Sequence, residues 1–137
     1  MGKANRKIAL RLVATNLLLF VVLYGLVALN KGVLRPALGQ VPFLGALTGV
    51  FPNFIAAYLV SLAFVNAVVT RKPRHGRPIV YASSLLVAAV LTFEELHPVW
   101  GASTHYDFFD VIASLAGSLL AILTFEIIAL KKKTARS

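Results

Sequence analysis

The chain has 137 residues, of which 58% are hydrophobic and only 14% are charged, and its mean hydropathy is +0.81. Soluble domains carry about 25% charged residues, and a domain this small has too much surface for its volume to hide so many apolar side chains. The composition therefore argues against a soluble protein and favours one whose outer faces contact lipid. The absence of cysteine excludes disulfides, thiolate metal sites and cysteine nucleophiles.

The net charge is +9, from 14 Lys and Arg against 5 Asp and Glu. A basic chain can bind nucleic acid, but that function requires a polar folded face on which the cations gather. Here the cations lie at the ends of apolar segments, where membrane proteins carry them. We therefore expect the lipid bilayer as the main partner and no nucleic acid.

Four apolar segments are each long enough, at roughly 20 residues, to cross a bilayer as a helix. They cover residues 8–29, 51–70, 79–96 and 108–130. Helices are expected because backbone groups in lipid must be paired within each segment. The first segment exceeds the apolar core of a usual signal peptide, so we expect it to be retained. The sequence thus predicts an all-α membrane protein with one domain of four transmembrane helices over residues 1–137.

The positions of the basic residues orient these spans. Short connections rich in Lys and Arg stay on the cytoplasmic side. Twelve of the fourteen basic residues fall in three zones that four spans place on one side: Lys3, Arg6, Lys7 and Arg11; Arg71, Lys72, Arg74 and Arg77; Lys131, Lys132, Lys133 and Arg136. The sequence therefore predicts a multi-pass protein with both termini in the cytoplasm.

The first outer connection, over residues 30–50, is unusually apolar and contains Pro36 and Pro42. Proline interrupts a helix, so we expect an apolar loop lying in the membrane interface. The alternative is a re-entrant cap over a cavity, which requires protein to shield its backbone. Pro52 and Pro78 are expected in the first turns of the second and third helices, where a missing N–H is tolerated.

Acidic residues gather near the outer face. Four of the five lie between positions 94 and 110, namely Glu94, Glu95, Asp107 and Asp110. The predicted topology places them at the outer ends of the third and fourth helices, with Asn53 at the outer end of the second. Polar groups from three helices are therefore expected to meet at one depth.

The fourth helix has a face with a distinct pattern. Steps of 3 and 4 stack five side chains on one side: Asp107, Asp110, Ser114, Gly117 and Ala121. Small residues let transmembrane helices approach closely, so the last three predict packing on a neighbour. The two aspartates either complement the positive end of the helix dipole and cap it or bind a ligand.

Glu94 and Glu95 end a helix, where the dipole disfavours anions. As neighbours they point about 100° apart, so we expect one to face the headgroups while the other turns inward. Glu126 lies near the other end of its helix, where we expect it to pair with one of the lysines at 131–133.

A metal site is the weaker interpretation of this acidic window. Oxygen and imidazole ligands suit zinc or a similar ion, and the window offers Glu94, His97, His105 and Asp107. Their spacing matches no strong motif. We therefore expect neither a metal nor a cofactor.

Residues 106–117, Tyr-Asp-Phe-Phe-Asp-Val-Ile-Ala-Ser-Leu-Ala-Gly, resemble the VanZ-like family of small bacterial membrane proteins. That family shows an aromatic residue, two spaced aspartates, a small residue or Asn, and Gly on its last helix. An acidic residue ends its third helix, as Glu94 or Glu95 does here, and a polar aromatic motif opens its second, as Asn53 and Phe54 do. This chain has Ser114 where the family usually has Asn, and it lacks the Gln that commonly follows the acidic residue.

The resemblance implies a bacterial plasma-membrane protein, linked in some members to glycopeptide antibiotic resistance, and it implies no reaction. We rank three functions. The first is binding of an envelope lipid or cationic amphiphile at the outer polar residues Asn53, Glu94, Glu95, Asp107, Asp110 and Ser114. The second is a structural subunit whose small-residue stripe packs on a protein partner or on a second copy. The third is an enzyme acting on a lipid-linked substrate through two carboxylates, so catalysis is the least expected.

Overall fold

The computed structural model describes residues 3–97 and 107–135. In these ranges every regular element is helical: α1 (Lys3–Leu29), the π-helical turn η1 (Asn30–Leu34), α2 (Arg35–Leu38), α3 (Pro42–Arg71), α4 (Gly76–Leu96) and α5 (Phe108–Thr134). The four long helices are each long and apolar enough to cross a membrane. The predicted helical class and the four candidate spans are confirmed.

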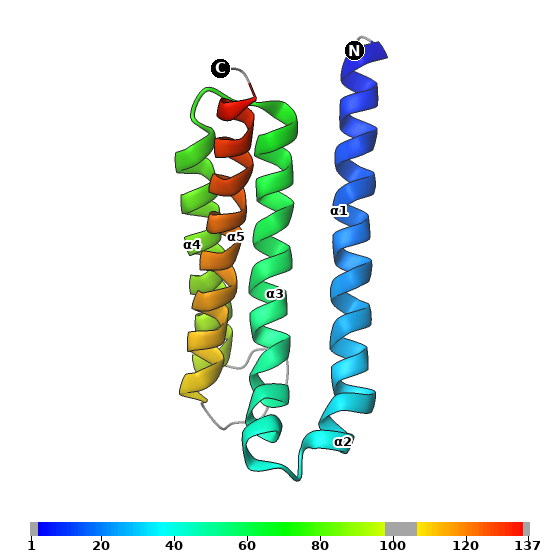
Figure 1. Ribbon diagram of the computed structural model, residues 1–137, viewed down its shortest axis with the longest axis vertical. Coiled ribbons are helices and arrows are strands. Elements are labelled where there is room, and N and C mark those ends of the chain that lie inside the picture. Colours follow the sequence, from blue (N-terminus) through cyan, green and yellow to red (C-terminus); the bar gives the residue numbers. More distant parts are fainter. Residues whose placement is uncertain (1–2, 98–106, 136–137) are drawn as a thin grey trace.

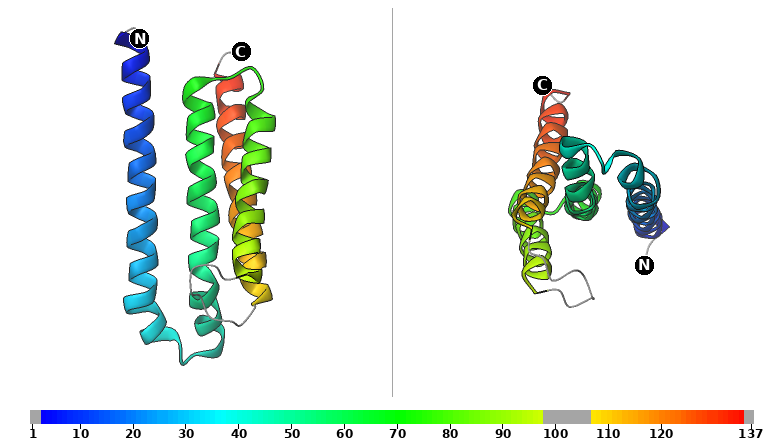
Figure 2. Two further views of the ribbon diagram at one scale, coloured as in Figure 1. Left: turned by 180° about the vertical axis from the view of Figure 1, so that it is seen from behind. Right: turned by 90° about the horizontal axis from the view of Figure 1, so that it is seen from below.

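The long helices run side by side, and both described termini lie at the same end (Figure 1). We call this end the basic end, and the opposite end, where α2 lies, the acidic end. Helix α3 is central, because it contacts α1, α4 and α5, whereas among the described residues α1 packs on no other long helix (Figure 2). Large apolar side chains cover the outside, among them Leu17, Leu85 and Leu119 at 63%, 67% and 59% exposure. Such an exterior suits lipid contact.

The closest helix contact joins α3 and α5 through small residues. A Cβ atom added at Gly117 would collide with the Phe54 carbonyl oxygen and would lie 2.9 Å from the Ala57 Cβ and 3.0 Å from the Tyr58 nitrogen. Ser114 and Ala121, on the same face of α5, are 2% and 0% exposed. The predicted packing stripe is therefore confirmed within the chain. Because α3 covers this stripe, a protein partner would have to use another face.

The segment between the first two spans differs from the expected loop. Helical structure continues through η1 and α2, and α3 begins at Pro42 rather than at residue 51. Pro36 and Pro42 do not break these helices, because each lies in the first turn of one, where no intrahelical partner is needed for the missing N–H. Pro52 consequently lies inside α3 rather than at its start, whereas Pro78 is in the first turn of α4 as expected.

Asn30 compensates for the interior proline. Pro52 has no N–H, so the carbonyl oxygen of Thr48, four residues earlier, lacks its helical donor. The Nδ2 group of Asn30, whose side chain is fully buried, donates to that oxygen at 2.8 Å. A buried carbonyl without a donor costs roughly 1–3 kcal/mol. The turn η1 therefore connects α1 to α2 and also supplies, through Asn30, the hydrogen-bond donor that α3 lacks at Pro52.

Candidate functional site

The acidic end brings together polar side chains from four helices. The groups that act electrostatically on the Asp110 carboxyl group are Asn53 from α3, Glu95 from α4, Asp107 and, from α2, Arg35. The backbone N–H of Asp107 also donates to Glu95 Oε1 at 3.4 Å. We call these five residues the acidic cluster. Four of them were candidates from the sequence, and the structure places those four together.

Asp107 is the N-cap of α5. Its backbone is extended, with φ −114° and ψ 111°, and its side chain accepts a hydrogen bond from Phe109 N at 2.9 Å. This bond satisfies one of the amide groups that the first turn of a helix leaves free. The capping interpretation therefore holds for Asp107, and Asp107 also contributes its charge to the cluster.

Asp110 has a different environment. It lies in the first turn of α5 and is half-buried. Its Oδ1 atom is buried and has no hydrogen-bond partner among residues 3–97 and 107–135, and the Asn53 side chain acts on the carboxyl group as a whole. A buried polar atom without a partner costs roughly 1–3 kcal/mol. Capping therefore does not account for Asp110, because the cap is Asp107.

Arg35 is the residue that sequence reasoning missed. It is one of the two basic residues outside the three basic zones, and it lies in the connection that was expected to be an irregular loop. The helical path through η1 and α2 instead brings it near Asp110. One sequence feature could have identified it: Arg35 lies in an otherwise apolar segment, and an Arg in such a segment near the membrane usually has a partner.

Two candidates lie outside the cluster's interactions. Glu94 is half-buried, as Glu95 is, but only Glu95 of the two acts on the Asp110 carboxyl group. Ser114 is 2% exposed and lies within the contact of α5 with α3. Its role is packing, so we do not retain it among the ligand contacts.

The metal alternative gains no support. In the part of the chain that the structure describes, no three His, Asp or Glu side chains lie close enough to hold an ion. His97 instead stacks on the ring of Phe93, with centroids 4.9 Å apart. His105 lies outside the described residues.

An apolar cavity lies on the same turns of α3 and α5 as Asn53 and Asp110. Its volume is about 420 Å³, and its lining is Leu47, Val50, Phe51, Phe54, Phe109, Ile112 and Ala113. Phe54 follows Asn53 in sequence, and Phe109 and Ala113 flank Asp110 within one helical turn. The acidic end thus places an apolar cavity beside a cluster of carboxylates, as an amphipathic ligand would require.

Glu126 does not pair with the lysines at 131–133. Its Oε2 accepts from Arg77 Nη2 of α4 at 2.9 Å, and its Oε1 accepts from the Tyr81 hydroxyl at 3.0 Å. Pairs along one helix need a spacing of three or four residues, and those lysines are five to seven residues away. The expected pairing was therefore wrong, and Glu126 links α5 to α4 instead.

A comparison of this chain with known protein families found no matching model, and searches of curated proteins and of solved structures found no match either.

Proposed function

We propose that this protein binds a cationic amphiphile, or an envelope lipid with a cationic headgroup, at the acidic cluster. The observation that carries the proposal is the buried Oδ1 atom of Asp110, which has no partner among the described residues. A ligand with an ammonium group relieves that cost, because it donates a charge-assisted hydrogen bond to the oxygen. Binding energy would therefore come from an oxygen atom to which no residue among 3–97 and 107–135 donates a hydrogen bond.

Charge and shape support the same class of ligand. Glu95, Asp107 and Asp110 outnumber the single cation Arg35 in the cluster, so the site attracts positive charge. The apolar cavity of about 420 Å³ between α3 and α5 is of a size that accepts an alkyl chain. An ammonium headgroup would lie at the carboxylates while its alkyl chain enters this cavity.

Direct binding of dodecylammonium to the purified protein in neutral nanodiscs tests the proposal. We expect the double variant Asp107→Asn/Asp110→Asn to bind at least about tenfold more weakly, since it loses two charged partners. Asn is as good an N-cap as Asp, so the variant should keep its fold. Glu126→Gln, which removes a carboxylate at the basic end, is the matched control and should bind as the wild type does. Equal affinity of the double variant and the wild type would refute the proposal.

We also propose the orientation that the cations indicate, with the basic end in the cytoplasm and the acidic end outside. Because the chain has no cysteine, single cysteines can be labelled without background. A membrane-impermeant maleimide should label Lys31→Cys in intact cells and should label Lys133→Cys only after the cells are opened. The reverse pattern would place the acidic cluster in the cytoplasm.

The resemblance to the VanZ-like family extends the proposal to a bacterial plasma membrane and to glycopeptide resistance. If the acidic cluster serves that function, cells expressing Asp107→Asn/Asp110→Asn will be more susceptible to a glycopeptide than cells with equal membrane levels of the wild type. Unchanged susceptibility, together with weakened dodecylammonium binding, would retain the ligand site and remove the link to resistance.

A further inference from the structure

Three cavities open at the basic end, and Lys72 and Lys132 line all three. The first has a volume of about 470 Å³ and lies between the end of α3, the turn into α4, and α5. The third extends to α1, where Lys7 and Arg11 join its lining. The two shared lysines therefore lie where the cavities meet.

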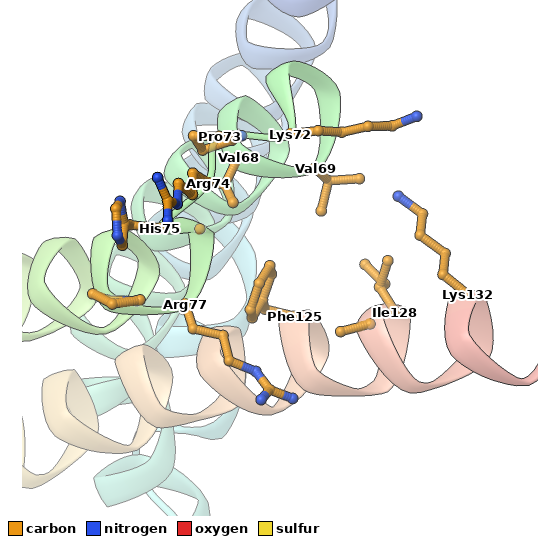
Figure 3. Close-up of a pocket in the computed structure, with 13 residues that line it drawn as sticks. Val68, Val69, Lys72, Pro73, Arg74, His75, Arg77, Phe125, Ile128 and Lys132 are labelled. Carbon is orange, nitrogen blue, oxygen red and sulfur yellow. The ribbon is translucent and has the colours of Figure 1, made fainter.

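The floor of the first cavity is apolar. It is formed by Val68 and Val69 of α3 and by Phe125 and Ile128 of α5, and Val68 and Phe125 belong to the buried core at this end of the bundle. Figure 3 shows Lys132 pointing from α5 toward α3, with Val69 and Ile128 on the same side as the two lysine side chains. The cavity thus combines cationic groups with an apolar floor.

Among the described residues, no Asp or Glu side chain neutralises these two lysines. Four of the five acidic residues of the chain are Glu94 and Glu95 at the end of α4 and Asp107 and Asp110 at the start of α5, and these helix ends lie at the other end of the bundle (Figure 1). The fifth, Glu126, is bound to Arg77 and Tyr81. Lys72 and Lys132 have no ion-pair partner among residues 3–97 and 107–135.

The backbone holds Lys72 in a fixed place. It is the C-cap of α3 in the left-handed conformation, with φ 51°, and its N–H donates to the Val68 carbonyl at 2.8 Å. Glycine or asparagine is usual at such a position, so lysine is an uncommon residue for this turn. Pro73 follows it and stops the helix. The ammonium group is therefore presented beside the apolar floor from an ordered turn.

We propose that the basic end binds an anionic phospholipid, with its phosphate between Lys72 and Lys132 and an acyl chain along Val69 and Ile128. Basic pockets between transmembrane helices recognise such headgroups, and lysine stems can lie along apolar surface while their ammonium groups reach the phosphate. This site is separate from the acidic cluster, so this proposal does not depend on the proposed function.

The test uses the purified full chain in neutral detergent, with phosphatidylglycerol as the probe and bound lipid counted by native mass spectrometry. We expect Lys72→Gln/Lys132→Gln to retain phosphatidylglycerol roughly ten- to thirty-fold less well than the wild type, from the usual contribution of two basic residues. Lys72→Arg/Lys132→Arg keeps both charges and should retain the lipid.

The matched control is Arg6→Gln/Arg71→Gln, which removes two exposed cations at the same end that line none of these cavities. An equal loss of lipid in this control would overturn the proposal, because it would show attraction by overall charge alone. Inorganic phosphate and phosphatidylcholine should not displace the bound lipid. Displacement by inorganic phosphate at similar concentration would also overturn it, since the acyl chain would then contribute nothing.

Discussion

The two ends of the helix bundle carry opposite charge and are built differently. At the acidic end, polar side chains come from four helices and contact backbone groups. The Asp107 carboxylate accepts from Phe109 N, and the Asp107 backbone N–H donates to Glu95 Oε1. At the basic end, long lysines line open cavities and a single ion pair, Arg77 with Glu126, is present among the described residues. The acidic end therefore holds its polar groups at defined positions, whereas the basic end mainly provides positive charge.

This difference determines which ligands each end of the bundle can distinguish. A short carboxylate on an ordered helix turn requires a ligand donor at a defined position, so the acidic end should discriminate by hydrogen bonding as well as by charge. Flexible ammonium groups tolerate many positions of a phosphate, so the basic end should accept several anionic headgroups. Both ends depend on the contact of α3 with α5, and substitutions can separate their contributions.

The largest expected effect comes from Gly117→Leu, which should disrupt both ends together. A Cβ at this position already collides with the Phe54 carbonyl oxygen, so a leucine must push α5 away from α3. We expect a loss of about 3 kcal/mol or more in the free energy of unfolding, at the upper end of overpacking effects. Unfolding by SDS in mixed micelles measures it.

Gly25→Leu is the control for that variant. An added Cβ at Gly25 would meet nothing within 4 Å, and leucine is the better helix former, so stability should be unchanged or slightly higher. If Gly117→Leu and Gly25→Leu had the same stability, the close contact of α3 with α5 would be wrong.

The next effect should be confined to the acidic end. Asn30→Leu removes the donor to the Thr48 carbonyl oxygen and should cost about 1–2 kcal/mol of unfolding free energy, as expected for an unpaired buried carbonyl. Pro52→Ala supplies a backbone N–H for the same oxygen. In a double-mutant cycle, Asn30→Leu should therefore cost clearly less in the Pro52→Ala background. Strict additivity would show that Asn30 does not compensate for Pro52.

The tie between α1 and α3 should have an intermediate effect. Asn66 Nδ2 donates to Asn16 Oδ1 at 2.8 Å, and Asn66→Leu leaves Asn16 without this donor. We expect a loss of about 1 kcal/mol, within the range measured for hydrogen bonds between transmembrane helices. Asn16→Leu/Asn66→Leu should recover part of the loss, and a further loss in the double variant would contradict the pairing.

The smallest effect is expected at the ion pair of Arg77 with Glu126. Arg77 is 63% exposed in its side chain, and exposed pairs contribute about 0–1 kcal/mol. Glu126→Gln should therefore lower the free energy of unfolding by less than about 1 kcal/mol, as measured by the same SDS titration. A loss above about 2 kcal/mol would mean that the pair is a major support for the contact of α4 with α5.

Sequence reasoning succeeded where the signal was local and periodic. Apolar length identified the four helices, and steps of three and four identified the buried face that carries Gly117.

Sequence reasoning failed where the structure depends on a contact between residues that are far apart in the sequence. Pro52 was expected to begin a helix because proline breaks one, and nothing near it in sequence shows that Asn30 supplies the missing donor. Arg35 was overlooked for the same reason, since only the helical path through α2 brings it near Asp110. Glu126 was assigned the nearest lysines along the chain, although its partner belongs to another helix.

The convergence of helices at the acidic end is tested most directly by intramolecular crosslinking in isolated membranes. Because the chain has no cysteine, Asn53→Cys/Asp110→Cys can be treated with a mild oxidant or a short dithiol-reactive linker and its remaining free thiols counted by maleimide labelling. We expect rapid loss of both thiols in this pair, and retention of both in Asn53→Cys/Leu115→Cys, whose second position is on an exposed face of α5. Equal crosslinking in the two pairs, or none in the first, would contradict the acidic cluster.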